Sequence, residues 1–319
     1  MHCTSFGLEA KIAASLRDAD GPGPDILALG SSLGVSDDVV QQGMDVLASL
    51  NCILESGGRY KLSKCHTMPL PWEIALGLET KSMGRRVHLF DSLPSTQDYA
   101  IDLAKDADAA GSVVMALEQT RGRGRHRKGW VSPPGGIWMS AVLRPDLDVG
   151  TSTLLPAAVS VALRRAILTS LGIETAIRWP NDIMYGGGKV AGIIVDADIE
   201  AGVFTSLVVG VGVNFNVDIA LVQDVIGTSE KAACLNNTPR GALLRFIRQF
   251  LVDLEDVTEK VRLNRTDAIL SEWTRYSCTI GYDVPPRYGG GTAIRLDPDG
   301  ALVVRQGSDM LRITADPTR

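Results

Sequence analysis

A cationic, glycine-rich stretch at residues 119–130 carries the clearest chemistry in this sequence. It reads Gln-Thr-Arg-Gly-Arg-Gly-Arg-His-Arg-Lys-Gly-Trp, with five lysines and arginines and no acidic residue. Its three glycines disfavour a regular helix or strand, so the pattern predicts a loop. Arginines in such a loop can pair with carboxylate or phosphate oxygens. On charge alone, a ligand-binding loop and a solvated basic patch remain equally open.

A second stretch places a lysine at the start of an apolar strand. Residues 178–183 read Arg-Trp-Pro-Asn-Asp-Ile, and after three glycines the chain continues with Lys189-Val-Ala-Gly-Ile-Ile. A lysine at the edge of a buried strand is costly unless an anion pairs with it. A carboxylate or phosphate ligand would supply that anion. Taken alone, however, a hairpin with a solvated edge lysine is the simpler explanation.

Two further stretches place polar or small residues beside predicted strands. Residues 91–98 include Ser95, Thr96 and Gln97, whose hydroxyls and amide could orient a polar head group. Ser95, followed by Asp98, can also cap a helix, and both roles can hold together. Residues 210–216 read Gly-Val-Gly-Val-Asn-Phe-Asn, and glycines in a strand allow close approach of a ligand. A bulge or a tight packing contact is the simpler explanation of this last stretch.

The elements that must position these residues lie in a central region of alternating strands and helices, about residues 85–270. This mixed order predicts an α/β or α+β domain. Strands are expected at 87–90, 112–117, 137–142, 189–196 and 207–214, and helices at 154–171 and 240–260.

Residues 1–64 predict a helical module that ends in a β-hairpin. Helices are expected at 8–16, at 25–33 and after the turn at 34–36, followed by two short strands. This order predicts a winged helix-turn-helix. The module has five basic and eight acidic residues, a net charge of −3, and its third helix opens with Asp37 and Asp38. Because DNA binding relies on neutralising phosphates, we expect weak or no DNA binding.

The remaining segments predict a linker and a small C-terminal domain. Residues 65–84 are expected to be a linker with a short helical stretch. Residues 271–319 alternate glycines with short β-rich runs, which predicts a small β-barrel.

Composition describes an ordinary globular chain. It has 319 residues, of which 45% are apolar and 22% charged. A net charge of −5 excludes a protein whose whole surface binds nucleic acid. Five cysteines without a CxxC pair argue against a disulfide framework or a zinc knuckle and favour the cytoplasm. No signal peptide and no apolar run of about 20 residues is found, so no membrane association is expected.

Taken together, the four stretches resemble the biotin protein ligase family. The resemblance covers about residues 85–270 and rests on the Gly-Arg-Gly-Arg loop, Trp-Pro-Asn-Asp and the Gly-Lys-Val-Ala-Gly-Ile strand. With the module in front, the chain resembles the longer type, in which the ligase is also a biotin-responsive repressor. The implied fold is α+β, with a winged helix-turn-helix, a central mixed α/β catalytic domain of the biotin/lipoate ligase type and a C-terminal SH3-like β-barrel.

The resemblance implies a two-step, ATP-dependent ligase reaction. Biotin is first activated to biotinyl-5′-AMP with release of pyrophosphate. The biotin then passes to a lysine of a biotin carboxyl carrier domain. Biotin and ATP would be substrates and Mg²⁺ an activator, with no tightly bound metal. The oligomeric state stays open, with a homodimer among the states considered.

Positions that match the family's motifs imply the roles of the site residues. The catalytic group would be Lys189, Arg123 and Arg125, with Lys189 contacting the biotin carboxylate and the α-phosphate. Biotin would contact Ser95, Thr96, Gln97, Gln119, Arg123, Gly124, Arg125, Lys189 and Gly192. ATP would contact Arg123, Trp130, Asn181, Asp182, Lys189 and Asn214, with Trp130 near the adenine and Asp182 also a Mg²⁺ ligand.

Some positions depart from the family pattern. Gln97 stands where the family usually has asparagine, and Arg178 stands where it usually has lysine. Arg127 stands where the family usually has a third glycine in the loop. The family's C-terminal arginine contact has no unique match, because Arg312 and Arg319 both qualify.

The same sequence leaves two other functions open. One is a lipoate or octanoate ligase, against which the loop at 121–130 argues. The other is a DNA-binding regulator that senses a small molecule without catalysis, against which the complete set including Lys189 argues.

Overall fold

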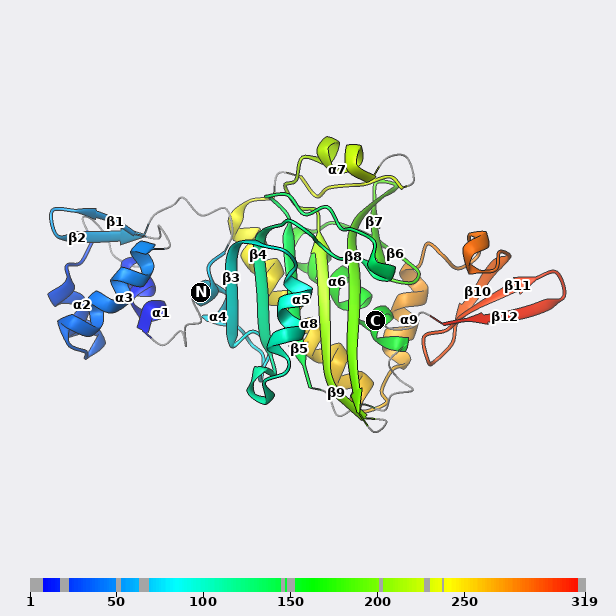
Figure 1. The fold of residues 1–319 in the computed structure, drawn as a ribbon, viewed down its shortest axis with the longest axis horizontal. Helices are drawn as coiled ribbons and strands as arrows, with labels where there is room; N and C mark the ends of the chain where they lie inside the picture. Colours follow the sequence, from blue (N-terminus) through cyan, green and yellow to red (C-terminus); the bar gives the residue numbers. More distant parts are fainter. Residues whose placement is uncertain are drawn as a thin grey trace.

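A seven-stranded mixed sheet forms the centre of the computed structural model, in the order β3-β4-β5-β9-β8-β7-β6 (Figure 1). The structure describes residues 8–17, 23–49, 53–62, 69–144, 147, 153–200, 203–226, 230–236 and 238–314. Strands β3 and β4 are parallel, and the other neighbouring pairs are antiparallel. The strands are β3 (Arg86–Leu93), β4 (Ser112–Gln119), β5 (Ile137–Leu143), β6 (Ala176–Arg178), β7 (Asp182–Tyr185), β8 (Gly188–Glu200) and β9 (Val203–Val213).

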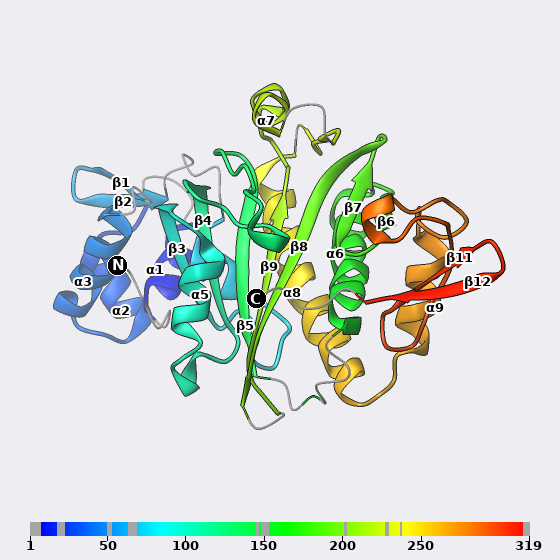
Figure 2. The ribbon, with the colours of Figure 1, turned by 45° about the vertical axis from the view of Figure 1, so that its right-hand side comes forward.

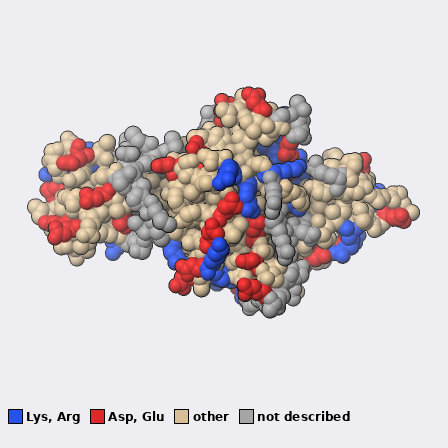
Figure 3. All heavy atoms as spheres, in the orientation of Figure 1, with Lys and Arg blue, Asp and Glu red and all other residues tan. Residues whose placement is uncertain are grey.

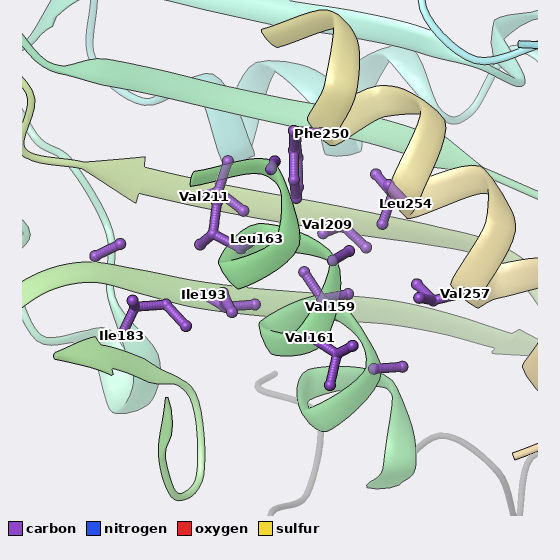
Figure 4. Close-up of a cluster of buried hydrophobic side chains, with 14 of the residues drawn as sticks. Val159, Val161, Leu163, Ile183, Ile193, Val209, Val211, Phe250, Leu254 and Val257 are labelled. Atoms are coloured by element: carbon purple, nitrogen blue, oxygen red, sulfur yellow. The ribbon is translucent and has the colours of Figure 1, made fainter. Parts of the chain in front are cut away.

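Helices α6 (Leu155–Leu171) and α8 (Arg240–Arg262) cover one face of the sheet, and α9 (Asp267–Tyr276) packs beside α6 (Figure 2). Helix α6 is apolar around most of its circumference because it lies between the sheet and the other helices. Figure 4 shows side chains of α6 and α8 meeting Val209 and Val211 of β9. Among the described helices, none is long and apolar enough to cross a membrane.

The opposite face of the sheet carries α5 (Thr96–Leu103) and leaves room for a site. Successive side chains of a strand point to opposite faces. In β9, Val209, Val211 and Val213 belong to the core under α6 and α8. The intervening Gly210 and Gly212 therefore face the α5 side, where they present bare backbone.

The N-terminal module has its own apolar core, and its elements lie close to their predicted positions. They are α1 (Leu8–Arg17), α2 (Ile26–Leu33), α3 (Asp37–Ser49), β1 (Ile53–Ser56) and β2 (Arg59–Leu62), with β1 and β2 antiparallel. The Asp25 carboxylate accepts from the amide of Ala28 and caps α2. Gly34 ends α2 with a left-handed φ of 69°, which favours glycine.

The predicted linker contains the expected short helix, α4 (Pro71–Ala75), and this helix is shared between two cores. Leu70 and Trp72 are buried in the core of the N-terminal module. Ile74 and Leu78 are buried in the core of the central sheet. The module is therefore packed onto the central domain through α4. Part of the predicted linker, residues 65–68, lies outside the described residues.

The C-terminal segment does not confirm the predicted barrel, because its described residues form a sheet that is not closed. They form an open antiparallel sheet of β10 (Thr292–Leu296), β11 (Leu302–Gln306) and β12 (Asp309–Ile313), preceded by a short 3-10 turn (Pro286–Tyr288). Three short strands are too few to close around an interior. Ala293, Leu302 and Val304 are buried instead against the core of the central domain. Figures 1 and 2 show this sheet and the N-terminal module at opposite ends of the molecule.

Glu255 of α8 anchors the turn that precedes β3. Its carboxylate accepts hydrogen bonds from the backbone amides of Lys81, Ser82 and Met83, at 2.7–3.0 Å. Burial alone would raise the pKa of Glu255, but these backbone hydrogen bonds outweigh it and lower the pKa below its ordinary value.

Glu255→Gln is expected to lower the free energy of unfolding at pH 7 by about 1–2 kcal/mol, allowing for partial exposure. Because the folded pKa is depressed, the carboxylate's contribution is present above the unfolded pKa and lost as pH falls through the folded pKa. The difference between variant and wild type should therefore shrink in acid, in urea titrations between pH 7 and 3. Glu259→Gln, which removes an exposed pair with Arg262 on the same helix, is the control and should change little. An equal effect at pH 7 and pH 3 would contradict this account.

Candidate active site

Two adjoining cavities lie on the α5 side of the sheet. The larger, about 1180 Å³, is lined by the stretch 118–134, residues 178–182, Lys189, α7 (Ile219–Ile226) and residues 278–288. The smaller, about 60 Å³, lies above the strands and is lined by the start of α5 and the glycines of β8 and β9. Figure 3 shows basic and acidic side chains side by side across the middle of the face in that view.

The cationic loop folds back on itself between β4 and β5. The amide of Trp130 donates to the carbonyl of Gly122 at 2.8 Å, and that of Gly124 to the carbonyl of Lys128 at 2.7 Å. A Cβ on Gly122 would lie 2.3 Å from the carbonyl oxygen of Trp130, so this fold requires glycine there. A short 3-10 turn (Arg125–Arg127) occupies the tip. The loop thus brings Arg125 and Trp130 to both cavities.

The indole of Trp130 lies directly on the glycines of β8 and β9. A Cβ on Gly212 would lie 2.3 Å from Trp130 Nε1, and one on Gly192 3.1 Å from Cζ3. Within the described part of the chain, the buried Nε1 has no hydrogen-bond partner. Lys189 Nζ lies 5.1 Å from the centre of the ring. The glycines therefore admit an aromatic ring to the strand surface, and that ring lines both cavities.

Lys189 stands where the two cavities meet, inside a cluster of alternating charges. Its Nζ lies 2.6 Å from Asp182 Oδ1 and 3.7 Å from Glu230 Oε2. Arg178 Nη2 lies 2.6 Å from Asp182 Oδ2 and also contacts Glu230 Oε1. Burial alone would lower the pKa of Arg178, but Asp182 and Glu230 outweigh it and raise the pKa. The edge lysine is therefore paired with anions, as its burial requires, but these anions belong to the protein.

The surroundings of Asp182 do not resemble a metal site. Its carboxylate lies between Lys189 and Arg178, whose positive charges repel a cation. The described residues contain no group of three or more His, Cys, Asp or Glu side chains able to hold a metal ion. The assignment of Asp182 as a Mg²⁺ ligand stays a prediction, and this pairing argues against it.

A polar network closes the inner end of the smaller cavity. Gln119 Oε1 accepts from the amide of Thr96 at 2.8 Å and from its hydroxyl at 3.1 Å. Gln119 Nε2 donates to Ser132 Oγ at 2.8 Å, and Thr96 Oγ1 lies 3.0 Å from Ser140 Oγ. The network brings together Thr96 and Gln119, which the sequence predicted, with Ser132 and Ser140, which it did not.

Ser95 and Gln97 are bonded within the protein. Ser95 Oγ accepts from the amide of Asp98 at 3.3 Å and caps α5, and Ser95 is 2% exposed. The amide nitrogen of Gln97 donates to Asp196 Oδ2 and to the carbonyl of Val208, both at 2.9 Å, and its oxygen accepts from Ser140 at 2.9 Å. Because three of the four hydrogen bonds that the Gln97 amide can make are formed within the protein, its geometry fits positioning Asp196 and Ser140 better than direct contact with a ligand.

Arg123 is held by two carboxylates on the outer side of the smaller cavity. Its guanidinium pairs with Asp98 of α5 and, at 2.7 Å, with Asp196 of β8. Burial raises the pKa of Asp196. The hydrogen bond from Gln97 and the positive charge of Arg123 lower this pKa, but burial outweighs them. Arg123 thus fastens the loop to the body of the domain.

Asn214 lines the larger cavity and carries a buried acceptor without a hydrogen-bond partner in the described part of the chain. It is 2% exposed, and its Nδ2 donates to the carbonyl of Ala233 at 3.0 Å. Its Oδ1 has no hydrogen-bond partner among the described residues. A buried polar atom without a partner is costly, so this oxygen fits a ligand that donates a hydrogen bond.

Comparison with known proteins decides the family. Residues 89–214 match the Biotin/lipoate A/B protein ligase family. The bifunctional ligase/repressor BirA of Bacillus subtilis (strain 168) is 32% identical over 249 residues, which cover 76% of each chain. This chain belongs to the biotin protein ligase family. It is a ligase, as the sequence predicted.

Other members of the family agree. The bifunctional ligase/repressor BirA of Escherichia coli (strain K12) is 28% identical over 237 residues, 70% of each chain. A solved biotin protein ligase from Aquifex aeolicus, in complex with biotin and ATP, has the same fold, with a TM-score of 0.56. It is 21% identical and matches 73% of this chain and 97% of that one. The central sheet is therefore the catalytic fold of the biotin protein ligase family.

Most residues implied by the family resemblance meet at the two cavities. Those that line them are Thr96, Gln97, Gln119, Arg123, Gly124, Arg125, Trp130, Asn181, Asp182, Lys189, Gly192 and Asn214. Ser95 lies beneath them as a helix cap. Arg312 pairs with Asp297 and Asp299 in the C-terminal sheet, and Arg319 lies outside the described residues.

Sequence reasoning missed the cavity-lining Glu230 and Tyr282. Neither belongs to a motif, and no signal in the sequence pointed to them.

Proposed function

We propose that this protein is an ATP-dependent ligase that attaches biotin to a biotin carboxyl carrier domain. The observation that carries this proposal is the position of Lys189 at the junction of a narrow cavity and a large one. A narrow cavity with a polar inner end suits biotin, and a large one with a free amide acceptor suits a nucleotide. Relatives from Paracoccus denitrificans and Mycobacterium tuberculosis bear the name biotin--[acetyl-CoA-carboxylase] ligase, which supports a carrier domain as acceptor.

Biotin would enter the smaller cavity with its ring toward Thr96 and Gln119. A space of about 60 Å³ is far below the roughly 300 Å³ at which ligand pockets begin. The Trp130 indole, which lies on Gly192 and Gly212, would therefore move to admit biotin. Its unpartnered Nε1 makes this displacement cheaper, because no hydrogen bond is lost.

ATP would occupy the larger cavity, with Asn181 and Asn214 at its inner wall. A carboxylate oxygen of biotin attacks the α-phosphorus, the bond to the β-phosphate oxygen breaks, and pyrophosphate leaves. Lys189 would neutralise the charge that gathers where the two anions meet. An uncharged lysine amine of the acceptor then attacks the acyl carbon, releasing AMP and a proton. Among the described residues, those around Asp182 do not form a site for a protein-bound metal.

A turnover assay tests the proposal against a lipoate or octanoate ligase. The protein is incubated with ATP, Mg²⁺, a carrier domain, and biotin, lipoate or octanoate in turn. Mass spectrometry should find the biotinyl adduct on the carrier domain. Lipoyl or octanoyl transfer without biotinyl transfer would replace this proposal with the other ligase, and no transfer at all would favour a sensor without catalysis.

We propose a winged helix-turn-helix for residues 1–64, a linker at 65–84, the catalytic domain at 85–270 and a C-terminal domain at 271–319. Three helices and a hairpin around a single core support the first of these. In this arrangement α3 is the recognition helix, and its N-terminal residues would face the bases and phosphates.

Weak or absent DNA binding is expected of this module. Helix α3 opens with Asp37 and Asp38 and contains no Lys or Arg. In Figure 3 acidic side chains predominate over the module, at the left of the picture. Carboxylates at the leading end of the helix repel phosphates, whose neutralisation supplies most of the non-specific affinity.

An anisotropy titration at about 0.15 M salt, with biotin and ATP present, measures this directly. The DNA is the region upstream of the protein's own gene, and the expected dissociation constant is micromolar or weaker. Asp37→Asn/Asp38→Asn should bind more tightly if the two carboxylates are the obstacle. Nanomolar, sequence-specific binding by the unaltered protein would contradict the prediction and make the chain a working repressor.

A further inference from the structure

Glu230 neutralises the cation pair at the centre of the proposed active site. Its two carboxylate oxygens face different cations, Oε1 toward Arg178 and Oε2 toward Lys189 at 3.7 Å. Asp182 pairs with the same two cations from the other side, with both separations 2.6 Å. Two acids therefore balance two bases, and the cluster carries no net positive charge toward an incoming anion.

Asp182 and Glu230 differ in exposure. The Asp182 side chain is 10% exposed and the Glu230 side chain 34%. Glu230 lines the larger cavity, where an anion would arrive. Of the two acids, Glu230 is therefore the one that solvent and ligand can reach.

The backbone around Glu230 is fixed to the same strand as Lys189. The amide of Lys189 donates to the carbonyl of Lys231, and that of Ala233 to the carbonyl of Lys189, both at 2.8 Å. Gln223 of α7 donates to the carbonyl of Glu230 and accepts from the amide of Ala232, both at 2.9 Å. The carboxylate can thus leave the cations by side-chain rotation, with these backbone contacts intact.

We propose that Glu230 is an internal anion that occupies Arg178 and Lys189 in the absence of ligand and is displaced by the carboxylate or phosphate of the substrate. This inference rests on the proposed function and adds to it a residue that determines anion affinity. Without ligand, the carboxylate keeps two partly buried cations paired. On binding, ligand oxygens replace it, and the Glu230 side chain rotates away from the two cations. Each substrate anion therefore competes with a charge of the protein itself.

Glu230→Gln removes the competing charge and keeps the shape of the side chain. Binding of biotin is measured by calorimetry and binding of pyrophosphate by thermal shift, both on the full-length protein. We expect both ligands to bind about tenfold more tightly to the variant, because one repulsive charge near the anion has gone. Glu230→Asp, which keeps the charge, should stay close to wild type. Glu118→Gln is the matched control, since Glu118 lines the same cavity and, in the described part of the chain, forms no ion pair with Arg178 or Lys189.

The readouts separate this inference from the proposed function. If Glu230 is only structural, Glu230→Gln should lower the melting temperature and weaken the binding of both biotin and pyrophosphate. That result would overturn the inference. If wild type forms biotinyl-AMP while Glu230→Gln leaves both affinities unchanged, the inference fails and the function stands. If wild type does not bind biotin but pyrophosphate binds more tightly to Glu230→Gln, the internal anion is supported and the biotin assignment fails.

Discussion

Lys189→Ala is expected to slow biotinyl-AMP formation by about 10²–10³-fold, the usual effect of removing one preorganised charge or donor from a transition state. Lys189 lines both cavities at their junction, where the biotin carboxylate and the α-phosphate would meet. The loss should appear mainly in kcat, because the charge at phosphorus develops during the reaction. Single-turnover assays with radiolabelled ATP measure the rate, and biotin affinity is measured separately.

Lys231→Ala is the control for this substitution. Lys231 is an exposed neighbour that contacts Lys189 through its backbone carbonyl, which alanine retains. It should leave the rate within about twofold of wild type, in line with the small effects of exposed charges. Normal adenylate formation by Lys189→Ala would remove Lys189 from the catalytic group.

Arg125→Gly is expected to release biotinyl-AMP about 10–100 times faster than wild type. Arg125 lines both cavities, so its guanidinium can reach an adenylate that spans them. Hydrogen bonds between charged groups contribute roughly 1.5–3 kcal/mol, which corresponds to this range of rates. Release is followed by stopped-flow fluorescence or by chase with unlabelled ligand.

A glycine also frees the backbone, and His126→Gly controls for that effect. His126 is exposed in the same loop and already has a left-handed φ of 54°, which glycine adopts without strain. This variant should retain the adenylate at nearly the wild-type rate. If His126→Gly and Arg125→Gly release it equally fast, loop flexibility and not the arginine explains retention.

Sequence reasoning worked best where a pattern determines local geometry. The expected strand at 207–214 corresponds to the C-terminal part of β9, and Gly212 there makes the tight packing contact that the sequence favoured, with Trp130. The turn and cap residues of the N-terminal module predicted its helices to within a residue or two. Motif resemblance then predicted Lys189 and its neighbours as site residues. In the structure, these residues line the two adjoining cavities.

Tertiary contacts account for what sequence could not provide. Glu230 belongs to no motif, and only the pairing of its segment with the start of β8 brings it to Lys189. The hydrogen bonds of the Gln97 amide with Asp196 and Ser140 join three separate elements, α5, β8 and β5. The barrel prediction is not confirmed, because glycine-separated β-runs indicate strands but not their number or closure. The described strands pack on the central core instead.

Release of pyrophosphate before any acceptor is added is the most direct test of the central claim. The full-length protein is mixed with ATP, Mg²⁺ and biotin, and pyrophosphate is counted by a coupled enzymatic assay. A ligase that activates biotin and retains the adenylate should give a burst of about one pyrophosphate per chain, and lipoate should give none. A burst driven by lipoate, or no biotin-dependent release at all, would contradict the account.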